Sequence, residues 1–168
     1  MNTSTDADTA LSNYLNGHLL ASEGGLRAFN AAVRTWQDSA HEQSFSDLKH
    51  EIARDRRDLA RIIRRLGFKP AAWKRVLTGI AQTAGELNPV NLLRQRGGSM
   101  SQLELDVLTG MVRTKLAMWD TLLKLAEHDL RLDTDLLRDL RRRAEEQIDE
   151  LQRIAFETFD ERFMTDSL

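Results

Sequence analysis

An apolar stripe that contains one carboxylate runs through residues 44–66 and constrains the fold more than any other stretch. Its members recur at steps of three and four residues, which is the spacing of one face of an α-helix: Phe45, Leu48, Ile52, Leu59, Ile62, Ile63 and Leu66. At about 100° per residue, Asp55 lies on this face between Ile52 and Leu59. Because a bare buried charge costs several kcal/mol, the carboxylate of Asp55 must be paired, hydrated, protonated or bound to a metal ion.

The rest of the chain carries helical periodicity too, so the sequence predicts an all-α protein with a single domain over residues 10–164. The expected helices cover about residues 9–39, 44–66, 71–84, 101–127 and 134–163. The polar, aperiodic residues 1–9 are expected to form a disordered tail. Gly24 and Gly25 lie inside the first helix and suggest close approach of another backbone or a local bend.

The ends of the predicted helices carry sequence signals. Gly67 is expected to end the helix over 44–66. Ser101 and Glu104 match a capping box for the helix over 101–127. Asp133 or Thr134 is the expected N-cap of the last helix.

Composition excludes several classes of protein. The chain has no cysteine, which excludes a disulfide framework, a thiolate zinc site and a cysteine nucleophile. Positive and negative charges nearly cancel, leaving a net charge of −2, which argues against a nucleic-acid partner. The sequence shows neither a signal peptide nor about 20 consecutive apolar residues, so we expect a cytoplasmic protein with no membrane contact.

Charged runs are predicted to face solvent. The last helix carries three consecutive arginines, residues 141–143, which are expected to lie largely on its wet face. On the helix over 44–66, Asp58 is interleaved with arginines that form a solvated face rather than a phosphate-binding patch: Arg54, Arg57, Arg61, Arg64 and Arg65.

The helix over 101–127 has apolar residues on two faces. Its main stripe contains Leu103 and Val107, and a second arc lies about 100° or more around the helix. That arc consists of Leu105, Val112, Leu116, Trp119 and Leu123. A helix that is apolar on two sides needs cover on both, from the connecting helix or from a second subunit, so we expect a homodimer.

About 34 residues separate the second long helix from the third, which is unusual between adjacent antiparallel helices. Two antiparallel helices, a long crossover and two more antiparallel helices make up the connectivity of a ferritin-like four-helix bundle. The chain resembles that superfamily, and is most similar to its small, uncharacterised actinomycete members. The resemblance lies in residues 14–26 (YLNGHLLASEGGL), 51–56 (EIARDR) and 110–119 (GMVRTKLAMW).

The resemblance implies a di-iron site, but the residues depart from its pattern. A di-iron member supplies one carboxylate from each of two helices and a Glu-x-x-His from each of the other two. Glu23 matches the first carboxylate. The second helix reads Glu51-x-x-Arg54 and the last helix reads Gln147-x-x-Glu150, so both histidines are missing.

Counting residues from one end of the bundle shows which groups share a level. Glu23, Asp55, Gln147 and Glu150 fall within a spread of about 8 Å, at 1.5 Å of rise per residue. Glu104 lies some two turns away from them. The third long helix places Thr114 and Lys115 at their level.

We therefore expect a buried polar cluster of Glu23, Asp55, Lys115 and Gln147. In this hypothesis Lys115 pairs with Asp55, Glu23 or both, and Gln147 is a neutral hydrogen-bond partner. A first alternative is a carboxylate-only metal site, which would hold iron or manganese with oxygen ligands alone: Glu23, Glu51, Asp55 and Glu150. In a second alternative these groups reach water and bind nothing.

The leading functional hypothesis is a non-catalytic binding or structural protein without a cofactor, whose dinuclear centre has been lost. The alternatives are a di-metal oxidase or iron-handling protein and an interaction adaptor. His18 is expected to be a hydrogen-bonded core histidine. Trp36, Trp73 and Trp119 are expected to anchor the core or an interface.

Overall fold

The part of the chain that the structure describes is entirely helical. The computed structural model describes residues 3–71 and 98–164, and within them it contains no strand. Its helices are α1 (Thr3–Thr35), α2 (Glu42–Arg65), α5 (Gly98–Ala126), α6 (Thr134–Glu157) and the short α7 (Phe159–Phe163). The all-α fold class is therefore confirmed. The expected helix over 71–84, with Trp73, lies outside the described residues except for Ala71.

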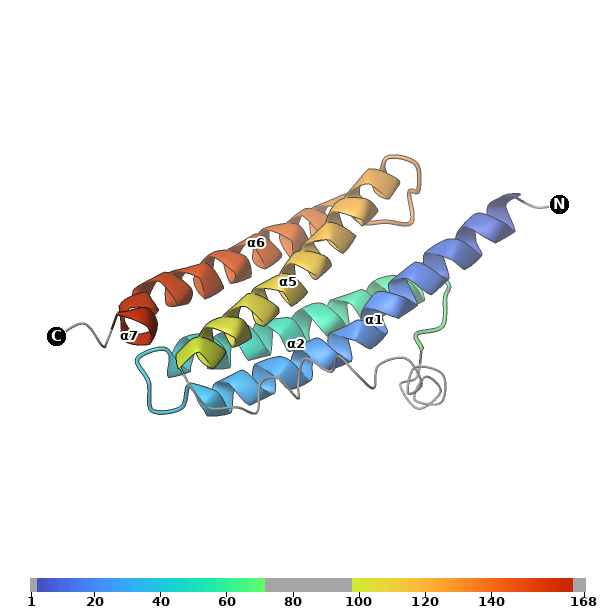
Figure 1. The fold of residues 1–168 in the computed structure, drawn as a ribbon. Helices are drawn as coiled ribbons and strands as arrows, with labels where there is room; N and C mark the ends of the chain where they lie inside the picture. Colours follow the sequence, from blue (N-terminus) through green and yellow to red (C-terminus); the bar gives the residue numbers. More distant parts are fainter. Residues whose placement is uncertain (1–2, 72–97, 165–168) are drawn as a thin grey trace.

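The four long helices form two antiparallel pairs. α1 packs along α2, and α5 packs along α6. Figure 1 shows that α2 and α5 both begin at the end of the molecule where α1 and α6 finish. α2 and α5 consequently run in the same direction, so the connection between them joins opposite ends of the molecule. The two pairs meet through α1 with α5 and α2 with α6.

Two predicted helix ends are present. After α2, Gly67 adopts a φ of +82°, and its N–H donates to Arg64 O while the N–H of Phe68 donates to Ile63 O. These two bonds satisfy carbonyls at the end of α2 in a Schellman motif, in which the left-handed position favours glycine. At the start of α6, the side chain of Asp133 accepts a hydrogen bond from the N–H of Leu136 at 3.0 Å.

Two predicted features of the helices are wrong, and one of two alternatives for a third is excluded. α1 begins at Thr3, so residues 3–9 are helical rather than a disordered tail. Among the described residues, a Cβ built on Gly24 or Gly25 meets nothing within 4 Å, so the close approach of another described backbone is absent there, and the alternative of a local bend stays a prediction. α5 already begins at Gly98, which places Ser101 and Glu104 inside the helix rather than at its N-terminus.

The last predicted helix is divided at Thr158. α6 ends at Glu157 and α7 starts at Phe159, while the hydroxyl of Thr158 donates to Ile154 O at 2.6 Å. The change of direction leaves Phe159 47% exposed, although the predicted helix over 134–163 continues through this residue. A hydroxyl bound to a carbonyl four residues earlier competes with the helix's own hydrogen bonds.

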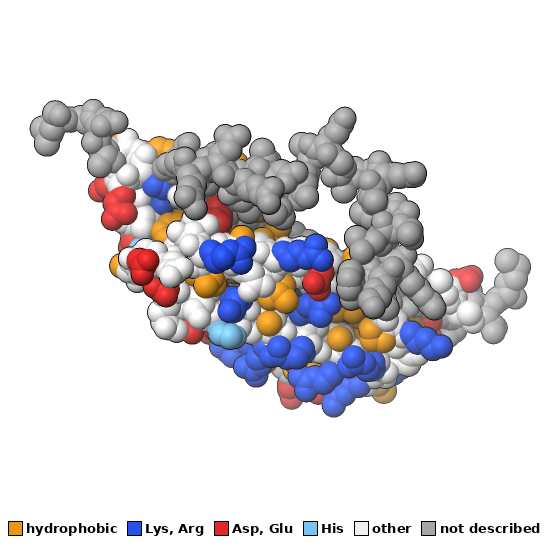
Figure 2. Space-filling view, turned by 90° about the horizontal axis from the view of Figure 1, so that it is seen from below, with side chains coloured by type: hydrophobic (Ala, Val, Ile, Leu, Met, Phe, Trp, Pro, Cys, Tyr) orange, Lys and Arg blue, Asp and Glu red, His pale blue; other side chains and the backbone are white. Residues whose placement is uncertain are grey.

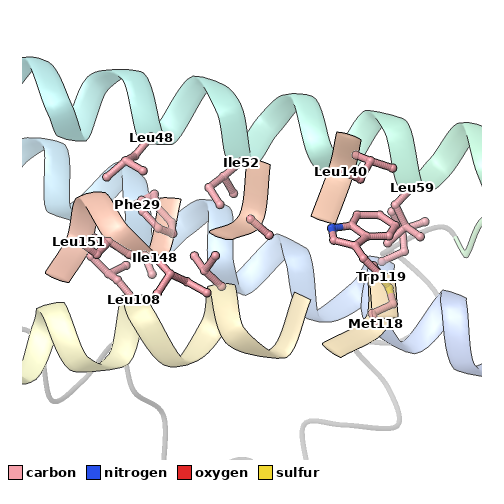
Figure 3. Close-up of a cluster of buried hydrophobic side chains, with 14 of the residues drawn as sticks. Phe29, Leu48, Ile52, Leu59, Leu108, Met118, Trp119, Leu140, Ile148 and Leu151 are labelled. Carbon is pink, nitrogen blue, oxygen red and sulfur yellow. The ribbon is translucent and has the colours of Figure 1, made fainter. Parts of the chain in front are cut away.

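The core lies between the two helical pairs. Figure 3 shows side chains of α1, α2, α5 and α6 converging there. The fully or almost fully buried residues include Phe29, Leu48, Leu59, Leu108, Met118, Trp119, Leu140 and Leu151. Each large apolar side chain removed from water contributes about 1.5–3 kcal/mol, so burial of this cluster is the main stabilising contribution.

The two apolar arcs of α5 are arranged differently from the prediction. Leu105, Val112 and Trp119, of the arc assigned to a partner, are at most 1% exposed within the single chain. Leu103, of the predicted core stripe, is 36% exposed. The second arc therefore lies mostly in the core of the single chain. The homodimer stays a prediction, but the need to cover this arc no longer supports it.

Among the described helices none has the length and apolar character needed to cross a bilayer. Figure 2 shows Lys and Arg side chains spread over the surface seen from below, with apolar side chains between them. The arginines expected on the solvated face of α2 are all exposed: Arg54, Arg57, Arg61, Arg64 and Arg65.

Candidate functional site

The site is centred on Asp55, which α2 presents to the interior. Asp55 is only 1% exposed, and its helical neighbours on the same face, Ile52 and Leu59, belong to the core. The apolar stripe of α2 forces this placement, because burying Ile52 and Leu59 rotates the residue between them inward as well. The carboxylate therefore needs a partner within the protein.

Lys115 of α5 supplies that partner. Its Nζ lies 2.5 Å from Asp55 Oδ2 and donates a second hydrogen bond to Gln147 Oε1, also at 2.5 Å. The amide of Gln147 in turn donates to Asp55 Oδ2 and Glu51 Oε2, each at 3.1 Å. Burial lowers the pKa of Lys115, and the adjacent charge of Asp55 offsets part of that shift.

Arg143 of α6 is a second cation at the site. Its Nη1 lies 2.8 Å from Asp55 Oδ1, and its Nη2 donates to Asp58 Oδ2 at 2.8 Å. Asp58 also accepts from Arg61, and is only 2% exposed. Burial alone would raise the pKa of Asp58, but the hydrogen bonds from Arg143 and Arg61 outweigh it and hold the pKa below its ordinary value.

The prediction that Arg143 and Asp58 face solvent is therefore wrong. The side chain of Arg143 is 8% exposed and that of Asp58 is 2% exposed. Sequence spacing contained a signal for both. Arg143 follows Leu140 by three residues and precedes Gln147 by four, and Asp58 follows Asp55 by three and precedes Ile62 by four. Each lies on the flank of a buried stripe.

Two of the carboxylates grouped with Asp55 by the sequence lie apart from it. Glu23 is one-third exposed and pairs with Arg56, whose Nη2 lies 3.0 Å from its Oε2. Glu23 is thus not a member of the Lys115 cluster. Glu150 pairs with Arg153 at 2.6 Å on the surface of α6.

Glu51 is exposed, accepts a hydrogen bond from Gln147 at 3.1 Å and acts on Lys115 through its charge. Within the part of the chain that the structure describes, no three His, Asp or Glu side chains are grouped so that they could hold a metal ion. The four predicted metal ligands are accordingly not brought together.

Glu104 is a further buried acid, on α5, that the sequence assigned to a helix cap. It is 3% exposed, and Trp36 Nε1 donates to its Oε2 at 3.1 Å. Burial raises the pKa of Glu104, and the hydrogen bond from Trp36 offsets part of that rise. This contact joins the residue that follows α1 to α5, near the end of the molecule where α5 begins.

A cavity of about 270 Å³ lies beside Lys115 and Asp55, between α1, α2 and α5. Its wall is mostly apolar, and includes Phe29, Ile52, Leu59, Met111, Val112, Met118 and Trp119. The polar wall residues are His18, Ser22, Asp55, Arg56, Thr114 and Lys115. Burial lowers the pKa of His18.

The buried charges and the cavity together form a site that can hold a small molecule by apolar contact and by hydrogen bonds at one end. No family model, curated protein or solved structure matches this chain.

Proposed function

We propose that this protein is a non-catalytic, ferritin-like four-helix bundle in which an internal lysine–carboxylate pair occupies the position of a dinuclear metal centre. The observation that carries the proposal is the position of Lys115, whose Nζ lies 2.5 Å from both Asp55 Oδ2 and Gln147 Oε1. The fold part of the proposal is supported by the two antiparallel pairs and by the common direction of α2 and α5.

The chemistry of the ammonium argues against a metal ion at this point. Lys115 neutralises Asp55 directly and so removes the ligand that a divalent cation would need. A divalent ion about 4 Å from a unit positive charge is repelled by roughly 8 kcal/mol at an effective dielectric constant of about 20. The carboxylates nearby are compensated by cations of the chain, because Asp55 also faces Arg143 and Asp58 faces Arg143 and Arg61.

Metal analysis of the purified protein, produced with iron and manganese in the growth medium, tests the proposal. We expect substoichiometric metal and no oxygen consumption when ferrous iron is added. About two tightly held equivalents of iron or manganese per chain, as in a two-metal site, would overturn it and favour the di-metal oxidase or iron-handling alternative.

A further inference from the structure

Two residues that line the 270 Å³ cavity carry buried N–H groups with no acceptor among the described residues. Arg56 Nε and Trp119 Nε1 are buried and have no hydrogen-bond partner among the described residues, and Trp119 is fully buried. Lys115 carries three N–H groups, of which two donate to Asp55 and Gln147. Because buried donors are normally satisfied, these groups indicate that the occupant of the cavity brings acceptors.

The main acceptor of the same wall, Asp55, is compensated by cations of the chain. Its Oδ2 accepts from Lys115, and its Oδ1, which has no hydrogen-bond partner among the described residues, forms an ion pair with Arg143 at 2.8 Å. The hydroxyl groups of Ser22 and Thr114 donate to backbone carbonyls of their own helices, so toward a ligand they can only accept. The charged donors of Lys115 and Arg56 therefore distinguish this wall, and they favour an ionised carboxylate.

The charges of the wall favour a single negative charge. Arg56 and Lys115 outnumber Asp55 by one positive charge, and the lowered pKa of His18 leaves its imidazole neutral near pH 7. Glu23 compensates Arg56 from outside the wall, but it is one-third exposed and binds Nη2 rather than Nε. Solvent therefore screens Glu23 more than it screens a ligand inside the cavity.

The volume of the cavity limits the size of the ligand. A dry cavity of about 150 Å³ holds benzene, so 270 Å³ accommodates on the order of ten non-hydrogen atoms. We infer that the cavity between α1, α2 and α5 binds a small monocarboxylate with an apolar body, whose carboxylate lies against Lys115 and whose body lies among the apolar wall residues. Such binding goes beyond the proposed function and does not depend on the metal content.

Three probes with one apolar body and different head groups test the inference: 3-phenylpropionate, 3-phenylpropan-1-ol and 3-phenylpropylamine. Each is titrated into the full-length protein by isothermal calorimetry. We expect one molecule of 3-phenylpropionate to bind per chain, at least about tenfold more tightly than the alcohol. The amine should bind no more tightly than the alcohol, because it meets donors and a positive charge.

Two glycines of α1 provide a matched pair of variants for the location. Gly25 lines the cavity and Gly24 does not, and a Cβ at either position meets nothing within 4 Å. Gly25→Leu should fill part of the cavity and weaken 3-phenylpropionate binding by at least about tenfold. Gly24→Leu should bind it as the wild-type protein does. Both changes raise helix propensity, so both variants should fold.

Lys115→Met tests the head group. This variant should bind the carboxylate and the alcohol with similar affinity, because the charged donor is gone while the apolar wall remains. Should Lys115→Met fail to fold, Arg56→Gln takes its place and should reduce the preference for the carboxylate. Equal affinity of the wild-type protein for all three probes, undiminished binding by Gly25→Leu, or no binding of 3-phenylpropionate would overturn the inference.

Discussion

Asp55 is stabilised by two cations from two different helices. Lys115 reaches Oδ2 from α5, and Arg143 reaches Oδ1 from α6. Transfer of such charges out of water costs several kcal/mol for each ion, and the pairing offsets that cost only while both partners are present. Removal of one partner should therefore destabilise the protein far more than replacement of both.

The first prediction concerns this pair. Lys115→Met should lower the free energy of unfolding by about 3–5 kcal/mol, because it removes one of the two cations that compensate buried Asp55 and leaves Arg143 as the other. Asp55→Leu/Lys115→Met should cost less than the sum of its single changes. Urea unfolding followed by circular dichroism measures both. Lys124→Met, at a 75% exposed lysine of the same helix, is the control and should have little effect. Additive single changes would contradict the prediction.

The second prediction concerns pH and Glu104. Its pKa in the native state is raised above the ordinary value of 4.5, so the native state binds this proton more tightly than the unfolded chain does. The resulting stabilisation is complete below pH 4.5 and is lost as the pH rises through the native pKa. Glu104→Gln keeps the shape and cannot ionise, so its stability should fall less than that of the wild-type protein between pH 4.5 and neutrality.

Unfolding in urea over this pH range checks the behaviour of Glu104. Glu127→Gln, at an exposed glutamate just beyond α5, is the control and should leave the pH dependence nearly unchanged. Parallel stability curves for Glu104→Gln and the wild-type protein would show that Glu104 does not titrate in this way.

For a single residue, the sequence predicts burial well when the position of the residue around its own helix decides whether it faces the core. Asp55 and Lys115 are of this kind, since one lies in an apolar stripe and the other shares its level. Arg143 and Asp58 were missed because they occur in charged runs, where composition suggests solvent. Their spacing places each on the flank of a buried stripe, and the contact between α2 and α6 decides that they are buried. Glu104 was missed because its local spacing from Ser101 also fits a helix cap.

At the scale of the element, glycines distinguish positions that need left-handed backbone from positions that do not. Gly24 lies within α1 and has open space around its Cβ position, whereas Gly67 holds a φ of +82° after α2. Gly24→Ala should raise the free energy of unfolding by about 0.5–1 kcal/mol. Gly67→Ala should lower it by about 1–2 kcal/mol, because a Cβ is disfavoured there.

Thermal unfolding of the two alanine variants beside the wild-type protein measures this pair of effects. A loss of stability in Gly24→Ala would show that α1 is strained near the cavity.

The order of the long helices and the Gly67 and Asp133 signals were predictable, because they depend on local chemistry. The break at Thr158 was not predictable from periodicity, which continues through Phe159.

At the scale of the whole molecule, the prediction of a homodimer remains to be tested. Leu116 and Leu123 of the second arc on α5 are partly buried in the chain and are the members still available to a partner. Light scattering after size exclusion should give about twice the chain mass of 19.2 kDa. Leu116→Glu/Leu123→Glu should reduce it to the mass of one chain, and a wild-type monomer would contradict the prediction.

Three polar contacts in the interior cross between the two helical pairs: Lys115 with Asp55, Arg143 with Asp58, and Glu104 with Trp36. Apolar side chains alone would allow one helical pair to slide along the other, since successive turns of an apolar helix face pack in much the same way. A slip by one turn, about 5.4 Å, would place these polar groups against apolar side chains and leave them without their partners. The buried polar contacts therefore fix the longitudinal position at which the two helical pairs pack against each other.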